Sequence, residues 1–500
     1  MAFRSKVTLL CLVCTFYFIA NTLSQFRSTS ALFSEENDNI VHIQPSRAWP
    51  TNINLDSEKQ THRNTETTTV DHAVSKSTND LGKMPLSDEK YVTFFTHSGF
   101  QNQLIQVENG ILLAWYLNRT LILPKALMGE AFGWSYFGKL HLEHMLRDDA
   151  VSDTCAEFEN EMNYWDVRCP DRERYAMLSF DEIFDLTWAK QHVRIVMRDE
   201  ASFDWLETKF GIRRAGVPDR GNGSYVDGDI LFFKGETRYD WRIFDTASKS
   251  HPRSKYAATL DIHQLRKRPE KLIHFSSLFG TGKLPIRRPE HWDFRNKLQL
   301  SITYRQPGVL WMTEQFIQKL GGEGNFIGLH VRSGDGWFVK ALPENINSVV
   351  SKITKAVDSR QTSVDSILSS PTEIPLNPTL DQCLALAKQH KVTLIYMATD
   401  ARSPRSEPAF DPLWKRYPCT FTMDDIIGQE DEAWSELDKY TDKRTGSSLR
   451  KFLIPLVDAA TASKGWFFIG SEGSTFSGYI LRLHDIFQSN LNNQSKALEA

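Results

Sequence analysis

The fold is decided by "YVTFFTHSGFQNQLIQVENGILLAWYLNRTLILP", residues 91–124. Residues 91–95 form a compact run of strand-forming residues, and residues 97–100 read as a turn. Residues 121–123 read as a second buried strand, which Pro124 closes. Between them, apolar residues recur at helical spacing, namely Leu104, Val107, Ile111, Leu112 and Trp115. Strand, glycine turn, helix and strand in this order predict a βαβ unit of a parallel sheet.

The second half of the chain repeats this organisation. Residues 326–329 and 392–400 predict buried strands, and residues 465–483 predict a strand, a Gly/Ser loop and a helix. Residues from about 355 to 380 are rich in Ser, Thr and Pro and predict a surface insertion. Ligands of open α/β sheets bind beyond the carboxyl ends of strands. Five polar residues fall at such ends: His330, Arg332, Asp335, Asp400 and Ser474.

These residue types are suited to binding a phosphate. Arg332 offers a fixed fork of N–H donors, which fits a phosphate or a carboxylate. "SEGSTFS", residues 471–477, adds hydroxyls, a glycine for close approach and a helix N-terminus with free N–H groups. The alternative for its serines and threonine is a plain helix cap. With Arg332 on a neighbouring strand end, we favour a pyrophosphate site.

Composition excludes a nucleic-acid-binding protein of the basic kind. The 500 residues carry a formal net charge of −3, so no strong positive field is present. The densest basic cluster, residues 266–268, is typical of a solvated surface. We therefore expect no nucleic-acid partner.

The N-terminus predicts a membrane anchor. Arg4 and Lys6 precede an apolar stretch, so we assign residues 1–6 to a cytosolic tail and residues 7–23 to a signal-anchor helix. A cleaved signal peptide is the alternative. Residues 24–88 are polar and predict a flexible stem. The expected location is the Golgi or endoplasmic-reticulum membrane, single-pass, with a lumenal body.

A lumenal location fits the cysteines and the glycosylation sequons. Cys155, Cys169, Cys383 and Cys419 are even in number and suit an oxidising compartment. They allow three pairings, of which the local one, Cys155–Cys169 with Cys383–Cys419, is our prediction. Sequons begin at the following positions: Asn118, Asn222 and Asn493.

Three other features have both a functional and a structural interpretation. Asp227-Gly-Asp229 could hold a metal, but these aspartates sit in a Gly-rich turn where Asp is common, and we expect no metal. Glu108 is either a hydrogen-bonded structural carboxylate or a perturbed catalytic one. "FGTGKL", residues 279–284, lacks the Ser/Thr and the upstream Gly of a Walker loop.

The motifs together resemble the GDP-fucose protein O-fucosyltransferase family, and a fungal-type member of it. Three segments carry the resemblance: "SGFQNQLIQVENGILLAWYLNRTLILP", "FIGLHVRSGD" and "VDAATASKGWFFIGSEGSTFSGYI". "HFSSLFGTG", residues 274–282, is also similar to fungal-type members. The resemblance spans residues 91–484 and implies a GT-B architecture, in which two Rossmann-like domains face each other across a cleft. The expected domains are residues 89–290 on the acceptor side and residues 291–500 on the GDP-sugar side.

The resemblance also implies roles for individual residues. Arg332 would stabilise the leaving GDP, and His330 and Asp335 would support its segment. Asp458 and the turn at Ser474, Thr475 and Phe476 would hold the guanine and the phosphates. Asn102 would lie at the cleft from the first domain. The candidate catalytic residues are Arg332, His97 and Asn102, and the candidate binding residues are Gly99, Phe100, Asn102, His330, Arg332, Asp335, Asp458, Ser474, Thr475 and Phe476.

The expected reaction is transfer of fucose from GDP-fucose with inversion, to a protein or glycan hydroxyl. Some relatives carry a Glu just before the Gly-Phe pair, whereas this chain has His97 and Ser98. His97 either takes the acceptor proton or simply ends the strand. No cofactor is expected besides the donor substrate. The alternatives are another nucleotide sugar or a glycan acceptor on the same fold, and a non-catalytic glycan- or nucleotide-binding protein.

Overall fold

The structure, a computed structural model, describes residues 88–148, 155–217, 223–248, 250–361, 375, 377–389 and 392–499. The predicted tail, the predicted anchor, nearly all of the predicted stem and the sequon at Asn222 lie outside these residues. Within the described ranges, no helix is both long enough and apolar enough to cross a membrane.

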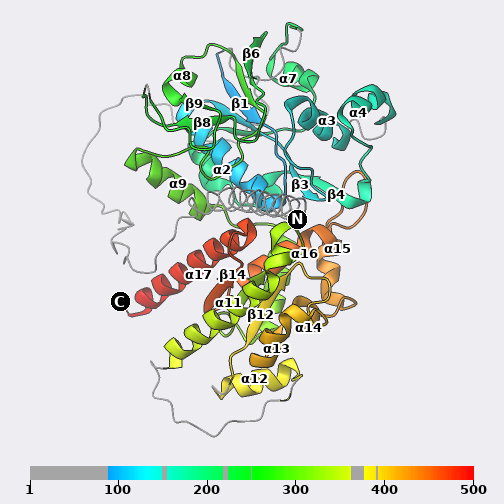
Figure 1. The fold of residues 1–500 in the computed structure, drawn as a ribbon, viewed down its shortest axis with the longest axis vertical. Coiled ribbons are helices and arrows are strands. Elements are labelled where there is room, and N and C mark those ends of the chain that lie inside the picture. Colours follow the sequence, from blue (N-terminus) through cyan, green and yellow to red (C-terminus); the bar gives the residue numbers. More distant parts are fainter. Residues whose placement is uncertain are drawn as a thin grey trace, which may run out of the picture. The chain divides into compact units, whose positions relative to one another are not determined.

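The first sheet has six strands and carries the predicted βαβ unit (Figure 1). Its order is β5-β2-β1-β10-β7-β6, and all neighbours are parallel except β6 and β7. Its strands are β1 Tyr91–Phe94, β2 Thr120–Leu123, β5 Ile195–Met197, β6 Ser224–Asp227, β7 Ile230–Phe233 and β10 Leu272–Phe275. Helix α2, Phe100–Leu117, joins β1 to β2, so the predicted strand, helix and strand are confirmed.

The second sheet has four parallel strands in the order β13-β12-β11-β14. Its strands are β11 Ile327–Val331, β12 Ile395–Thr399, β13 Thr420–Phe421 and β14 Phe467–Gly470. The strands predicted at 326–329 and 392–400 are therefore present, with small shifts of their ends, and so are the strand, loop and helix predicted within 465–483. A mainly parallel sheet and a fully parallel sheet, each combined with helices, confirm the predicted α/β class with two Rossmann-like halves.

Smaller elements complete the described chain. Two two-stranded sheets pair β3 Ala126–Gly129 with β4 Tyr175–Leu178, and β8 Trp241–Phe244 with β9 Ala258–Asp261. The helices of the first half are α3 Phe137–Arg147, α4 Glu159–Trp165, α5 Phe180–Ile183, α6 Thr187–His192, α7 Phe203–Phe210, α8 Ile262–Arg266 and α9 Pro289–Ser301. Those of the second half are α10 Pro307–Lys319, α11 Gly336–Gln361, α12 Leu380–Lys388, α13 Asp411–Arg416, α14 Met423–Ile426, α15 Ser435–Asp438, α16 Arg450–Ala462 and α17 Thr475–Glu499.

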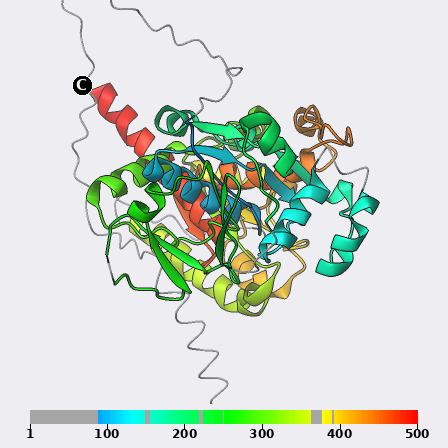
Figure 2. The same ribbon diagram turned by 90° about the horizontal axis from the view of Figure 1, so that it is seen from above.

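Two helices extend beyond what the sequence patterns predicted. The predicted insertion, about 355–380, begins inside α11, which runs to Gln361. Residues 362–374 and 376 of that insertion lie outside the described residues. Helix α17 continues to Glu499, and its carboxyl-terminal part projects outward in both ribbon views (Figures 1 and 2).

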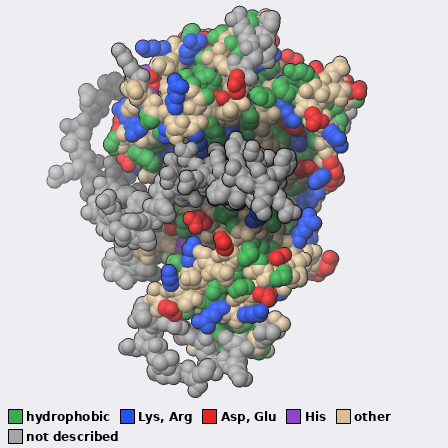
Figure 3. Space-filling model, viewed as in Figure 1, with side chains coloured by type: hydrophobic (Ala, Val, Ile, Leu, Met, Phe, Trp, Pro, Cys, Tyr) green, Lys and Arg blue, Asp and Glu red, His purple; other side chains and the backbone are tan. Residues whose placement is uncertain are grey.

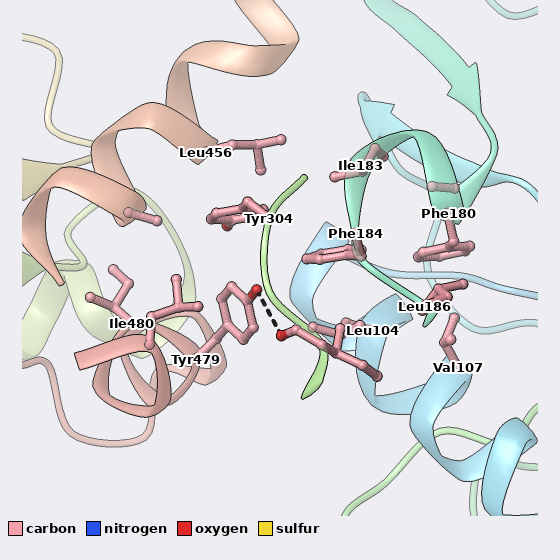
Figure 4. Close-up of a cluster of buried hydrophobic side chains, with 14 of the residues drawn as sticks. Leu104, Val107, Phe180, Ile183, Phe184, Leu186, Tyr304, Leu456, Tyr479 and Ile480 are labelled. Carbon is pink, nitrogen blue, oxygen red and sulfur yellow. Dashed lines mark hydrogen bonds between the residues drawn. The ribbon is translucent and has the colours of Figure 1, made fainter. Parts of the chain in front are cut away.

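One apolar core includes side chains from both halves (Figure 4). Phe184 stacks on Tyr304 with ring centroids 5.4 Å apart, and Tyr479 of α17 meets the edge of both rings. The Tyr479 hydroxyl also donates to the Ile302 carbonyl at 3.4 Å. Because α17 also contacts α2, the helix that follows the second sheet is packed against the helix that follows β1.

Both predicted disulfides are confirmed. Cys155 is bonded to Cys169 beside α4, and Cys383 of α12 is bonded to Cys419 at the start of β13. The second bond ties a helix of the second half to an edge strand of its sheet.

Candidate functional site

The carboxyl end of β11 carries the central residue, Arg332. The Arg332 backbone N–H donates to Ser471 Oγ at 2.9 Å, which ties this strand end to the end of β14. The Arg332 guanidinium pairs with Asp335 at 2.7 Å and with Asp400 at 3.0 Å. One third of the Arg332 side chain stays exposed, so the fork is held in place yet open to solvent. An arginine that is positioned in this way and still partly exposed can donate hydrogen bonds to an oxyanion.

Asp400, at the end of β12, organises the loop that follows Arg332. Its carboxylate accepts the backbone N–H of Ser333 at 2.7 Å and that of Gly334 at 3.1 Å. A Cβ on Gly334 would lie 2.6 Å from the Asp400 carboxylate, so only glycine permits this approach. Asp400 was placed at a strand end by the sequence, but its pairing with Arg332 was missed, because two strands far apart in sequence meet only in the sheet.

Asp335 holds the Arg332 guanidinium less firmly than Asp400 does. Its side chain is 66% exposed, and its contact with Arg332 is an ion pair three residues apart in the chain. Pairs of this kind contribute little to stability because solvent screens them. An incoming phosphate could therefore replace Asp335 on Arg332 at small cost, while Asp400 would remain.

His330 connects β11 to the first turn of α17. Its Nδ1 lies 2.6 Å from Ser477 Oγ, and its ring meets the edge of Phe476 with centroids 5.1 Å apart. Burial lowers the pKa of His330 to about 4. A buried neutral imidazole with these contacts supports the loops and does not titrate near neutral pH.

The turn between β14 and α17 presents the predicted hydroxyls. Ser474 caps α17, because its Oγ accepts the backbone N–H of Ser477 at 3.2 Å. Thr475 is the exposed first residue of α17, and Phe476 packs on the core. The cap interpretation of Ser474 is therefore confirmed, and Thr475 is left facing solvent at a helix N-terminus.

Asp458 lies within α16 and contacts the second sheet. The hydroxyl of Tyr396, on β12, donates to Asp458 Oδ1 at 2.5 Å, and the backbone N–H of Thr399 also lies close. Burial raises the pKa of Asp458 to about 7. The structure thus brings together Arg332, His330, Asp335, Asp458 and Ser474–Phe476 around one edge of the second sheet.

The other predicted residues gather at the carboxyl end of β1, in the first sheet. Gly99 is the N-cap of α2, lacks a side-chain cap, and has open space where a Cβ would point. Phe100 stacks on Phe184 with ring centroids 5.5 Å apart. Asn102 Oδ1 is buried and has no hydrogen-bond partner in the described part of the chain. A buried unsatisfied amide oxygen is uncommon and is a candidate contact for a ligand.

The proposed base role of His97 conflicts with its surroundings. His97 is fully buried, with Nδ1 2.8 Å from Ser98 Oγ and Nε2 2.7 Å from Ser277 Oγ. Burial lowers the pKa of His97 to about 3. Both ring nitrogens are already engaged by serine hydroxyls, so His97 fixes the loop after β1 instead of taking a proton.

Glu108, Asp227 and Asp229, for which the sequence left both a functional and a structural role open, make structural contacts. Glu108 is buried and accepts from Arg482 at 2.6 Å and from Gln299 at 2.7 Å. Asp227 accepts from Arg214 and from two backbone N–H groups, and Asp229 accepts the N–H of Arg213. In the described ranges, no group of three or more His, Cys, Asp or Glu side chains is placed to hold a metal ion.

Charged side chains of both signs are interspersed on the face shown in Figure 3. This distribution agrees with the small net charge of the sequence. Among the described residues visible on that face, neither sign of charge dominates.

Comparisons with known proteins return structural matches only. No family model matches the chain, and no curated protein sequence matches it. POFUT1 in complex with GDP-fucose matches with 13% identity, 81% of this chain and 96% of that chain covered, and a TM-score of 0.34. Fucosyltransferase NodZ from Bradyrhizobium matches with 12% identity, 79% and 92% covered, and a TM-score of 0.34. Likeness this low assigns no activity.

Proposed function

We propose that this protein is an inverting glycosyltransferase that moves fucose from GDP-fucose to a serine or threonine hydroxyl of a secretory-pathway protein. The observation that carries the proposal is the pairing of Arg332 with Asp400 at the carboxyl edge of the second sheet. The motif resemblance adds the identity of the donor, and the contacts of Arg332 add a chemical reason for it.

The arginine would act on the leaving group. The acceptor oxygen bonds to the anomeric carbon of fucose while the bond from that carbon to the β-phosphate oxygen breaks. The electron pair leaves with GDP, and the acceptor proton passes to a base or to water. Arg332 is held by Asp400 before the donor arrives, so it needs little reorganisation when charge develops on the diphosphate. No metal or cofactor enters this scheme.

The guanine would be held by Asp458 and the turn at Ser474–Phe476. An ionised Asp458 can accept two N–H groups of guanine, and Tyr396 orients its carboxylate. The exposed N-terminus of α17 at Thr475 is suited to the phosphates. Gly99, Phe100 and Asn102 would approach the donor or the acceptor from the first sheet, with the unpaired Asn102 Oδ1 as the contact atom.

A lumenal location is part of the proposal. Two disulfides suit an oxidising compartment. Asn118 and Asn493, each the first residue of a sequon, are exposed at the surface. Tethering by residues 7–23 would place the body in the Golgi or the endoplasmic reticulum.

The test is GDP release from GDP-fucose by the purified full-length chain, wild type against Arg332→Ala, with GDP binding measured by calorimetry. We expect slow release by the wild type and loss of it in the variant. A wild-type chain that fails to bind GDP would contradict the donor assignment.

A second candidate is a nucleotide-sugar-binding protein without turnover. The specific observation in its favour is His97, whose two ring nitrogens are both engaged, so the residue nearest the expected base position cannot take a proton. GDP binding without release in the presence of many acceptors would favour this candidate.

A further inference from the structure

The first sheet has a topological switch point between β1 and β10, where the order in which the chain adds strands changes direction. From β1 the chain builds β2 and β5 on one side, whereas β10 and β7 lie on the other side. β1 and β10 are parallel neighbours, so their carboxyl ends open on the same edge. Open α/β sheets bind ligands at such a point.

The loops after these two strands are joined. His97, after β1, lies 2.7 Å from the hydroxyl of Ser277, after β10, and its ring packs on Phe279. Asn109 of α2 donates to the carbonyls of Leu278 and Gly280. The loop at residues 276–284 is therefore fixed against α2 and against the end of β1.

Lys283, at the end of this loop, has an unusual environment for a lysine, because its ammonium group is buried. Its side chain is 1% exposed, and its Nζ forms no hydrogen bond with a described residue, so that only the charge of Asp240 acts on it. The nearest recorded contact of Nζ is the ring of Tyr256, whose centroid lies 5.7 Å away. Asp240 influences it through charge, but the Asp240 carboxylate already accepts the backbone N–H groups of Glu236 and Thr237. A buried ammonium without a hydrogen-bond acceptor is costly, and Asp240 offsets this cost only through its charge.

Tyr256 contributes a second unsatisfied group at the same place. Its hydroxyl is buried and has no hydrogen-bond partner among the described residues. A Cβ on Gly280 would lie 3.1 Å from that hydroxyl, and one on Gly282 would lie 3.8 Å from it. Gly280 also has φ of +113°, which a residue with a side chain rarely adopts. The two glycines thus keep the backbone close to the polar end of Tyr256.

Two further cations, Arg242 and Arg238, lie near this loop, beside the carboxylate of Asp240. The guanidinium of Arg242 lies 5.8 Å from the ring centroid of Tyr256 and donates to the Gly282 carbonyl. The guanidinium of Arg238 lies 5.5 Å from the ring centroid of Phe279. Burial lowers the pKa of Lys283 to about 7, so an arriving anion would readily restore its full charge.

We propose that Lys283 and Tyr256, beneath the Gly280–Gly282 loop, form an oxyanion-binding subsite at the β1/β10 switch point. The ligand is a phosphate-type or carboxylate group that accepts from Lys283 Nζ and Tyr256 Oη. Two sources share this chemistry: the diphosphate of a nucleotide donor, or an acidic group on an acceptor. The argument for this subsite uses only contacts within the first half of the chain, and it does not rest on the fucosyltransferase proposal.

The experiment uses the full-length chain with two probes, GDP and inorganic pyrophosphate, in calorimetry. The variants are Lys283→Met, Lys283→Arg and Tyr256→Phe, each also made with Arg332→Ala so that binding at Arg332 is removed. Thermal unfolding is measured in parallel. Methionine is close to lysine in length and carries no charge, so Lys283→Met should be as stable as the wild type or more stable.

We expect Lys283→Met to weaken pyrophosphate binding in the Arg332→Ala background by about ten- to a hundredfold. Lys283→Arg should retain part of the binding, and Tyr256→Phe should lose about tenfold. If GDP binding weakens as well, the anion is the donor diphosphate; if only pyrophosphate binding weakens, it comes from another ligand. Equal pyrophosphate binding with and without Lys283, or no binding by either chain, overturns the proposal. So does a destabilised Lys283→Met chain with unchanged binding, because that result describes a purely structural lysine.

Discussion

The carboxylate of Asp400 lies 3.0 Å from Nη1 of Arg332 and also accepts two backbone N–H groups of the loop that follows Arg332. One side chain therefore fixes both the guanidinium and the backbone around it. This preorganisation is what an arginine needs in order to stabilise a departing diphosphate.

Replacing Arg332 should remove turnover while leaving the fold intact. Arg332→Ala deletes a group that is one third exposed, so the melting temperature should change little. We expect the rate of GDP release from GDP-fucose to fall about 10²- to 10³-fold, because a donor to the developing charge is lost. Arg332→Lys keeps a charge but not the fork, and should restore only part of the rate. An unchanged rate in Arg332→Ala would remove this residue from the mechanism.

Asp400 should matter more than Asp335. Asp400→Asn keeps the shape of the side chain but loses the charge that holds Arg332, and we expect at least about a tenfold lower rate from misplacement of the guanidinium. Asp335→Asn is the matched control, because Asp335 is 66% exposed and its ion pair is screened. The rates of GDP release by Asp400→Asn and Asp335→Asn, measured side by side, show which carboxylate matters more. A larger loss in Asp335→Asn would contradict the assignment.

Binding of GDP should depend on pH through Asp458. Burial raises the pKa of this carboxyl to about 7, and only the ionised form can accept two N–H groups of guanine. Affinity should therefore fall as the pH drops through 7, by about tenfold between pH 8 and pH 6. Calorimetric titration at several pH values measures this. Asp458→Asn should bind GDP weakly and without this pH dependence; a variant that keeps the dependence would show that another group titrates.

Acid should destabilise the protein through its buried histidines. Burial lowers the pKa of five of them far below 6.5: His97, His141, His144, His274 and His330. Below pH 6.5 these histidines are protonated in the unfolded chain but stay neutral in the folded chain. The free energy of unfolding therefore falls as the pH drops from about 6.5 toward 4. Each histidine contributes up to about 1.4 kcal/mol per pH unit in this window.

The melting temperature measured from pH 8 to pH 4.5 tests this expectation. It should be nearly level above pH 7 and fall steeply below pH 6.5. The raised pKa values of Asp458, Asp240 and Asp485 act in the opposite direction, but five histidines outweigh these three carboxyls. A melting temperature that stays constant down to pH 4.5 would mean that these imidazoles are not buried as neutral groups.

Glu108 and Arg482 join α2 to α17, and removal of either alone should be destabilising. Glu108→Ala leaves Arg482 mostly buried without its partner, at a cost of about 3–5 kcal/mol. The double variant Glu108→Gln with Arg482→Met removes both charges and should recover most of that loss. Urea unfolding midpoints measure both. Equal stability of the single and the double variants would show that packing, and not charge pairing, sets the cost.

Much of the fold could be predicted from local patterns. The strand, helix and strand of residues 91–124 and the strands near 327, 395 and 467 are each encoded by short apolar runs and glycine turns. The local disulfide pairing was also predicted correctly. The length of α11 was missed, because its Pro343 and polar carboxyl-terminal part weaken the helical pattern.

The sequence by itself determined the α/β class and the set of polar residues that follow the strands, because a strand and the loop after it are neighbours in the chain. Only the tertiary structure decided which of these residues work together. The pairing of Arg332 with Asp400, the burial of His97 and the burial of Lys283 against Tyr256 each depend on segments far apart in sequence. Burial and pairing set the charge and accessibility of a side chain, and both are fixed by packing between elements and not by the residues next to it.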